Sequence, residues 1–208
     1  MEKLQIRELL KRGLSFVIKN PVLFMLGFIA NLPLLFVSKE LSLASAYGFL
    51  AYLLVTPYLF GLIMKFVYES ADKEPSWGSI NQIVLKKYFF LLFAYIIYYL
   101  VMLCGFVLFV IPGIFLSIRL LLCDAGVLFE GEGVFVSLRR SWRITRGSWW
   151  RMFALVLICY LPVVIFSFLE NVLRKEIYLP VNFLITVFAC VWYQCIFTLA
   201  YLRLRNNN

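Results

Sequence analysis

The stretch of sequence that decides the fold runs from residue 88 to residue 129 and reads YFFLLFAYIIYYLVMLCGFVLFVIPGIFLSIRLLLCDAGVLF. Arg119 and Asp124 are its only charged residues, and it is about twice as long as the 20 or so apolar residues that cross a bilayer as a helix. The segment Val110-Ile111-Pro112-Gly113 lies in its middle, and proline followed by glycine favours a turn over a continuous helix. The stretch therefore predicts two transmembrane helices, at 88–110 and 112–129, joined as a tight hairpin.

The rest of the chain has the same apolar character. Apolar residues make up 63% of the 208 residues and charged residues 15%, whereas soluble domains have roughly 45–50% and about 25%. The N-terminal segment MEKLQIRELLKRGLSFVIKN carries charges throughout, which is not the pattern of a cleavable signal peptide. Further apolar stretches run over 21–38, 45–68, 149–170 and 181–202. We predict an all-α fold, a single membrane domain over 1–208 that forms a polytopic membrane bundle of six transmembrane helices.

Lysine and arginine are distributed unevenly between the predicted connections. Of the twenty, Lys39, Arg174 and Lys175 lie on one side of the six-helix map, Arg119 falls within a span, and the other sixteen lie on the opposite side. Loops rich in these residues stay in the cytoplasm. We therefore expect a multi-pass protein of a bacterial-type cytoplasmic (inner) membrane, with both termini cytoplasmic.

An amphipathic segment precedes each outward-going span. The chain thus divides into three units of amphipathic helix plus hairpin, at 1–69, 70–130 and 131–208, and all three hairpins would point the same way. The second segment is the weakest, a short helix that starts at Pro75-Ser76 and ends at Lys86-Lys87. The units are either a true repeat or a chance match between apolar sequences.

These amphipathic segments are either solvated linker helices or helices that lie in the cytoplasmic interface, and we favour the interface with anionic lipid. The predicted apolar stripes are Ile6, Leu9, Leu10, Leu14 and Val17 in the first segment and Phe135, Leu138 and Trp142 in the third. Glu130 is expected to hold the third segment by bonding to Arg139, Arg140 or Arg143. The predicted lipid-interface residues, with two tryptophans at headgroup level, are Lys3, Arg7, Lys11, Arg139, Arg140, Arg143, Arg146, Trp149 and Trp150.

Polar residues inside the predicted spans are the candidates for a functional site, because a charge in hydrocarbon costs several kcal/mol unless it is paired or hydrated. These residues are Arg119, Asp124, Asn31 and Gln194. Five residues of helix place Arg119 and Asp124 about 140° apart, so we expect them to face different neighbours. They are either an anion contact and a proton-sensitive group in a polar path, or structural partners of Asn31, Gln194 or backbone carbonyls. We favour the structural role.

Known catalytic and ligand-binding patterns do not occur in this sequence. It has no histidine, its five cysteines have no CxxC spacing, and it contains no glycine-rich phosphate loop. The sequence therefore predicts no metal, no cofactor and no enzyme activity. The positive-inside pattern already explains the formal charge of +9, so nucleic acid is not an expected partner.

A group of short motifs lies between residues 111 and 151. They are Ile111-Pro112-Gly113-Ile114, Arg119, Glu130-Gly131 and the segment SLRRSWRITRGSWWR at 137–151, whose core is Ser-x-x-x-Thr-x-Gly-x-Trp-Trp. This pattern resembles the membrane domain found on some bacterial glycerophosphoryl diester phosphodiesterases and on stand-alone relatives. The resemblance implies an amphipathic start followed by six spans. The chain departs from it at Asp124-Ala125-Gly126, where members often carry proline. It also lacks the phosphodiesterase barrel with its histidines, so hydrolase activity is not implied.

Together these patterns predict a non-enzymatic accessory or lipid-interacting protein of the cytoplasmic membrane, with anionic membrane lipids as its partners. The alternative is a small transporter or permease subunit with a polar path at Arg119 and Asp124. Neither inverted repeats nor an ATP-binding motif supports that alternative. An intramembrane lipid enzyme would need a cluster of acid, base or metal-binding groups, which the sequence does not show.

Overall fold

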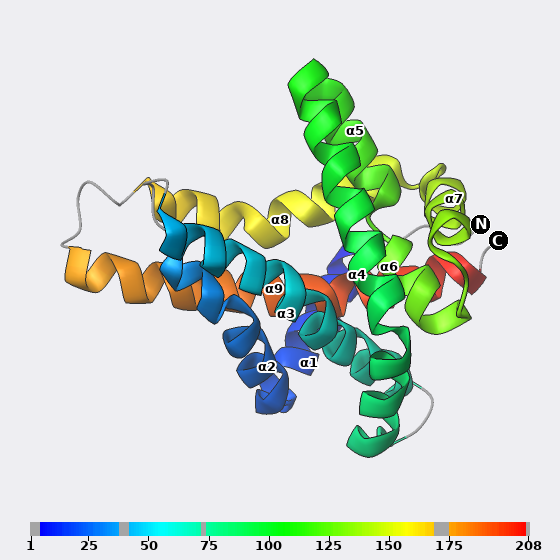
Figure 1. Ribbon diagram of the computed structural model, residues 1–208. Helices are drawn as coiled ribbons and strands as arrows, with labels where there is room; N and C mark the ends of the chain where they lie inside the picture. The colour runs from blue at the N-terminus through cyan, green and yellow to red at the C-terminus, as the bar shows by residue number, and fades with distance from the viewer. Residues whose placement is uncertain (1–4, 38–41, 72–73, 169–174, 207–208) are drawn as a thin grey trace.

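The computed structural model describes residues 5–37, 42–71, 74–168 and 175–206, and every regular element in these ranges is a helix (Figure 1). The longer helices are α3 (Leu43–Glu69), α4 (Trp77–Leu108), α8 (Trp149–Ser167) and α9 (Lys175–Asn206). The shorter ones are α1 (Ile6–Lys19), α2 (Pro21–Asn31), η1 (Leu32–Phe36), α5 (Val110–Leu120), α6 (Cys123–Ala125), η2 (Gly126–Glu130) and α7 (Val134–Thr145). The predicted all-α fold is confirmed.

Five stretches in the described ranges are long and apolar enough to cross a membrane. The helices α3, α4, α8 and α9 qualify singly, and α5, α6 and η2 qualify together over Val110–Glu130. A sixth candidate is the bent pair formed by α1 with α2 and η1, whose two arms meet at 90°. The first predicted stretch corresponds to α2 and η1, and its helix changes from the α to the 3-10 form at Leu32-Pro33.

Helix α9 is the centre of the packing. It contacts α1, α2, α3 and α8, and it lies alongside α8 in Figure 1. Val191, Cys195 and Ile196 on α9 are fully buried, and they belong to the same core cluster as Leu23 of α2 and Leu155 of α8. The last helix of the chain therefore organises the core.

Helix α1 is amphipathic as predicted, but its apolar face packs on α9. Leu9 and Val17 are buried, and the Trp192 indole of α9 donates a hydrogen bond of 3.3 Å to the Leu10 carbonyl. The predicted apolar stripe of this segment is therefore used mainly for contact within the protein.

Charges fix α1 to the end of α9 and leave a basic face free. The Glu8 carboxylate pairs with Arg203, whose hydrogen bond lowers the pKa of Glu8. Arg7 and Lys11 are exposed, as a lipid-facing surface requires. Lys3 lies outside the described residues.

The second amphipathic segment is not a separate helix, which corrects the sequence prediction. Helix α4 starts after Ser76 as predicted, but it continues to Leu108 without a break at Lys86-Lys87. The physical reason is that one buried face runs on through Ile80, Val84, Leu91 and Ala94 at helical spacing, and no proline or glycine interrupts it.

Helices α4 and α5 form the predicted hairpin. The chain turns at Phe109, whose backbone is extended, so α5 already begins at Val110. Gly105 and Gly113 face each other across the hairpin, and a Cβ on Gly105 would lie 2.8 Å from the Gly113 Cα. Glycine at both positions therefore allows the two backbones to approach closely.

The α4–α5 hairpin lies at a different angle from the other helices, and the side of a membrane to which each hairpin would project stays a prediction. In Figure 1 the tip of α4 and α5 projects upward, whereas α3 begins and α8 ends together at the left. The first half of α4 is fixed to α3, where Val84 and Leu91 lie against Gly61. Its outer half packs on α5 and diverges from the other hairpins.

The fourth predicted span, 112–129, is not one helix. Helix α5 ends at Leu120, a turn follows at Leu121-Leu122, and α6 gives way to the π-helix η2. The segment ends at Gly131, whose φ of 70° is the left-handed conformation that glycine adopts most readily.

We expect Gly113→Ala to destabilise the protein by about 1–3 kcal/mol, the usual cost of overpacking. The added methyl would lie 2.8 Å from the Phe106 ring and 2.9 Å from the Phe106 nitrogen. Gly78→Ala is the matched control, because no atom lies within 4 Å of its added methyl. Thermal unfolding of the purified variants in a mild detergent measures both effects. Equal melting temperatures for Gly113→Ala and the wild type would contradict the close packing of the hairpin.

Candidate functional site

Helix α7 docks on the break between α5 and α6 through small polar side chains. Ser137, Ser141 and Thr145 recur every four residues on one face and are fully buried. The Ser141 hydroxyl donates to the Arg119 carbonyl at 2.8 Å and accepts from the Leu122 N–H at 3.1 Å. These are backbone groups that a broken helix leaves without an internal partner. Ser141 therefore replaces hydrogen bonds lost at the break, and the Thr145 hydroxyl also lies 3.3 Å from the Arg119 carbonyl.

This docking leaves the predicted apolar stripe of α7 on the outside of the protein. Phe135 and Trp142 are 72% and 40% exposed, because the serine and threonine face occupies the contact. Arg139 and Arg143 are exposed beside them. The outer face of α7 therefore combines apolar and basic side chains on one accessible surface.

Arg119 lies at the edge of this surface, between two aromatic rings. Its guanidinium is 5.0 Å from the centre of the Phe115 ring and 5.2 Å from that of the Trp142 ring, and it donates to the Trp142 carbonyl at 3.3 Å. The Arg119 Nε is buried and has no hydrogen-bond partner in the part of the chain that the structure describes. One donor of this guanidinium is therefore unsatisfied.

A groove of about 740 Å³ runs past Arg119, and we call it the arginine groove. Trp149 stacks on Phe153 in its wall, and Trp150 is 75% exposed. Ile111 belongs to the same wall. The complete lining is Ile111, Ile114, Phe115, Arg119, Arg146, Gly147, Ser148, Trp149, Trp150, Arg151 and Phe153. The groove thus joins guanidinium groups to a continuous apolar and aromatic wall.

Asp124 lines a different space, a cavity of about 330 Å³ between α3, α4, α8, α9 and the broken helix. We call it the tyrosine cavity because its lining includes Tyr52, Tyr95, Tyr98, Tyr99, Tyr160 and Tyr193. The Asp124 carboxylate accepts the Ala125 N–H at 2.8 Å, and Tyr95 lines the cavity beside it. Asp124 is only partly buried, since it borders the cavity.

The polar residues singled out in the sequence are divided among three places. Arg119 and Asp124 have different neighbours, as predicted. Gln194 lines the tyrosine cavity with Asp124. Asn31 lines neither space, because its side-chain amide donates to the Gly27 carbonyl of its own helix at 2.7 Å. The four residues therefore do not form a single polar path.

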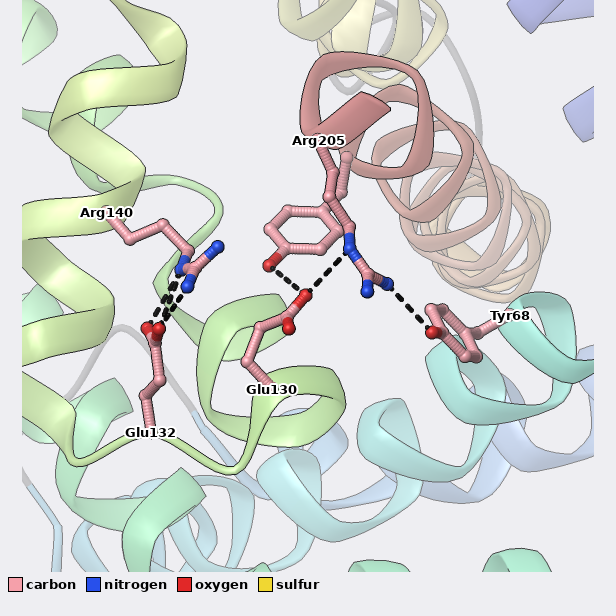
Figure 2. Close-up of polar contacts among 6 residues, drawn as sticks. Tyr68, Glu130, Glu132, Arg140 and Arg205 are labelled. Atoms are coloured by element: carbon pink, nitrogen blue, oxygen red, sulfur yellow. Dashed lines mark hydrogen bonds and ion pairs between the residues drawn. The ribbon is translucent and has the colours of Figure 1, made fainter. Parts of the chain in front are cut away.

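A carboxylate other than the predicted one holds α7. Glu132 binds the Arg140 guanidinium, with 2.9 Å between the arginine Nε and the carboxylate, and this hydrogen bond raises the pKa of Arg140 (Figure 2). Arg140 is therefore engaged within the protein, unlike the exposed Arg139 and Arg143.

Glu130 holds the end of α9 instead of α7, so its predicted pairing with Arg139, Arg140 or Arg143 is wrong. It accepts from the Tyr201 hydroxyl at 3.2 Å and pairs with Arg205 at 3.1 Å, and Arg205 also donates to Tyr68 of α3 (Figure 2). The left-handed Gly131 lies between the two carboxylates, and Figure 2 shows them directed toward different helices.

Sequence reasoning missed the tyrosine cavity. Tyr95, Tyr98 and Tyr99 share one face of α4, and their spacing was a signal that was available in the sequence. Tyr160 and Tyr193 come from α8 and α9, and only the packing of these helices brings them to the same cavity.

These features define an all-helical protein with a basic groove on one side of a broken helix and a tyrosine-lined cavity on the other. Residues 97–202, about half of the chain, match the family model described as Domain of unknown function (DUF7847), and the chain belongs to this family. The matched region contains the break, α7 and Asp124. Neither the curated proteins nor the solved structures gave a match to the chain.

We expect Ser141→Ala to cost about 1–3 kcal/mol of stability, because it leaves the buried Leu122 N–H without its acceptor. Ser167→Ala is the control, since that serine is exposed and donates only to the Val164 carbonyl of its own helix. Thermal unfolding reports the loss of stability, and the rate of tryptic cleavage in α7 reports undocking. If the two variants match in both measurements, Ser141 does not anchor α7.

Proposed function

We propose that the chain is a non-enzymatic, multi-pass protein of a bacterial-type cytoplasmic membrane that contacts anionic lipid through α7 and the arginine groove. The observation that carries this proposal is the orientation of α7. Its polar face is used for docking, so Phe135, Trp142, Arg139 and Arg143 remain exposed together. A helix with an apolar and basic outer surface binds well at the boundary between anionic headgroups and acyl chains.

Six membrane spans are part of the proposal. Five come from the long apolar stretches, and the first is α2 with η1. Eleven α-helical and five 3-10 residues give a length of about 26 Å, close to the roughly 30 Å of hydrocarbon. The outer surface of α4 supports contact with acyl chains, because Phe89, Phe93 and Leu100 are at least half exposed.

The distribution of charge supports a cytoplasmic location for one end of the bundle. The pairing of Arg203 with Glu8 and of Arg205 with Glu130 brings the end of α9 close to α1 and to the segment before α7. The exposed basic residues of α1 and α7 thus lie toward the same end of the molecule. Under the positive-inside rule this end faces the cytoplasm.

The arginine groove offers the chemistry of a phospholipid site. A guanidinium binds phosphate through strong charge-assisted hydrogen bonds, and Arg119 lines the groove with its Nε unpaired among the described residues. Arg146 adds a second, exposed guanidinium. Ile111 and Ile114 continue the groove as an apolar wall that suits an acyl chain.

A transporter is the second candidate function. It is favoured by the cavity that contains Asp124 and Gln194, but a path through both Arg119 and Asp124 is not supported, because these residues line different spaces. The resemblance to the membrane domain of glycerophosphoryl diester phosphodiesterases stays a prediction, since the matching family has no assigned function.

We expect anionic phosphatidylglycerol to raise the melting temperature of the wild type in nanodiscs above its value in neutral phosphatidylcholine. The triple variant Arg139→Gln, Arg143→Gln and Arg146→Gln should lose most of this increase, since each basic residue near an anionic surface contributes about 1 kcal/mol. Lysine at the same three positions is the control and should retain most of it. No lipid effect in the wild type, or an equal effect in the glutamine variant, overturns the α7 contact.

Membrane topology is tested by labelling single cysteines, in a variant without the native ones, with an impermeant maleimide on intact bacterial cells. We expect Leu43→Cys and Val110→Cys to be labelled from outside and Arg139→Cys only after permeabilisation. All three positions are exposed in the structure. The Val110 position is decisive, because the α4–α5 tip diverges from the other hairpins. Labelling of Val110→Cys only after permeabilisation would rule out six spans.

A further inference from the structure

The tyrosine cavity contains one carboxylate and many aromatic rings. Asp124 is the only charged side chain among the described residues that line it. Six tyrosines line the same space, half of the twelve in the chain, and they come from α3, α4, α8 and α9. The cavity therefore concentrates aromatic surface around a single negative charge.

The aromatic rings form walls at different angles. Tyr98 and Tyr99 meet edge to face with their ring centres 5.7 Å apart, and Tyr95 is tilted against Tyr99 at 6.2 Å. On the opposite side, the rings of Tyr160 and Tyr193 are 5.4 Å apart and inclined by 58°. Rings from three helices, inclined to one another, therefore line the cavity.

The Asp124 carboxylate borders a cavity lined mostly by apolar and aromatic groups. A positive partner would stabilise it there, because an unpaired charge removed from water is costly. Among the described residues the carboxylate accepts a hydrogen bond from the Ala125 N–H, and the cavity lining supplies no cationic side chain to pair with it. The π faces of tyrosine rings attract cations, above all organic ammonium ions. The carboxylate and the rings therefore favour the same kind of ligand.

We propose that the tyrosine cavity binds a small organic ammonium ion, with Asp124 as its counter-charge and the tyrosine rings as its walls. A volume of about 330 Å³ is far larger than a metal ion needs. Divalent cations such as Ca²⁺ also require six or more oxygen ligands, whereas this lining supplies one carboxylate. Two kinds of ligand carry such an ammonium group, a free amine and the headgroup of a lipid, and the last experiment below distinguishes them.

This site is separate from the proposed lipid contact. The arginine groove lies on the α7 side of the broken helix and shares no lining residue with the tyrosine cavity. An experiment in uncharged detergent, without anionic lipid, therefore tests the cavity alone. Its failure would leave the proposed contact with anionic lipid untouched.

The first test uses the wild-type chain purified in an uncharged maltoside detergent. Methylammonium, choline and tetraethylammonium chlorides are titrated by calorimetry and by thermal shift at constant ionic strength, with sodium chloride as the balance. We expect at least one of them to bind and to raise the melting temperature. The neutral carbon isostere of choline, 3,3-dimethylbutan-1-ol, should not. If no ammonium ion exceeds sodium, or if the neutral isostere binds as tightly as choline, the proposal is wrong.

Three variants locate the site, one at Asp124 and a matched pair at Tyr98. Asp124→Asn should weaken binding by at least about thirtyfold, because it removes the charge of a buried pair. Tyr98→Leu should weaken it by about fivefold, whereas Tyr98→Phe retains the ring and should bind nearly as the wild type does. The pair at Tyr98 keeps the proposal testable even if Asp124→Asn does not fold. Unchanged binding in Asp124→Asn or in Tyr98→Leu would place the ligand elsewhere and overturn the proposal.

The source of the ammonium group is identified in the same assay. Dihexanoyl-phosphatidylcholine presents the choline group on a short lipid, below the concentration at which it forms micelles. Tighter binding of this lipid than of choline, lost in Asp124→Asn, identifies a headgroup ligand. Binding of the free ammonium ion alone identifies a soluble amine.

Discussion

A helix that breaks inside a packed bundle must find new partners for its backbone groups, and this constraint governs the arrangement around α7. The turn at Leu121-Leu122 leaves the Arg119 carbonyl and the Leu122 N–H without helical partners, and the Ser141 hydroxyl binds both. A hydroxyl can do this because it donates one hydrogen bond and accepts others. The break therefore fixes which face of α7 is buried, and through it which side chains remain at the surface.

The same break separates the two charged residues of this region. Arg119 belongs to the last turn before the break and points toward the rings of Phe115 and Trp142. Asp124 follows the break and borders the tyrosine cavity. The angular argument for a continuous helix also predicted different neighbours, but the interruption places these residues in two distinct environments, one basic and one aromatic.

Local patterns in the sequence predicted most of the helices but neither the continuity of α4 nor the break after α5, which tertiary contacts decide. The α4–α5 hairpin and the amphipathic α1 follow from turn residues and apolar spacing, although the chain turns at Phe109 and Pro112-Gly113 lie in the first turn of α5. The buried face of α7 could not be predicted from hydrophobicity, because two serines and a threonine are buried against the broken helix while Phe135 and Trp142 are exposed. The partner of Glu130 and the composition of the tyrosine cavity depend on helices far apart in the chain, and no local pattern specifies them.

The central position of α9 has a consequence for biosynthesis. Chains emerge from the ribosome N-terminus first at roughly 5–20 residues per second. The part of α9 that contacts α1 is therefore synthesised about 10–40 s after α1. Until then Leu9 and Val17 of α1 and Leu23 of α2 have no completed core to enter. A ribosome that stalls before Val191 would therefore leave a set of apolar helices without the helix on which they pack.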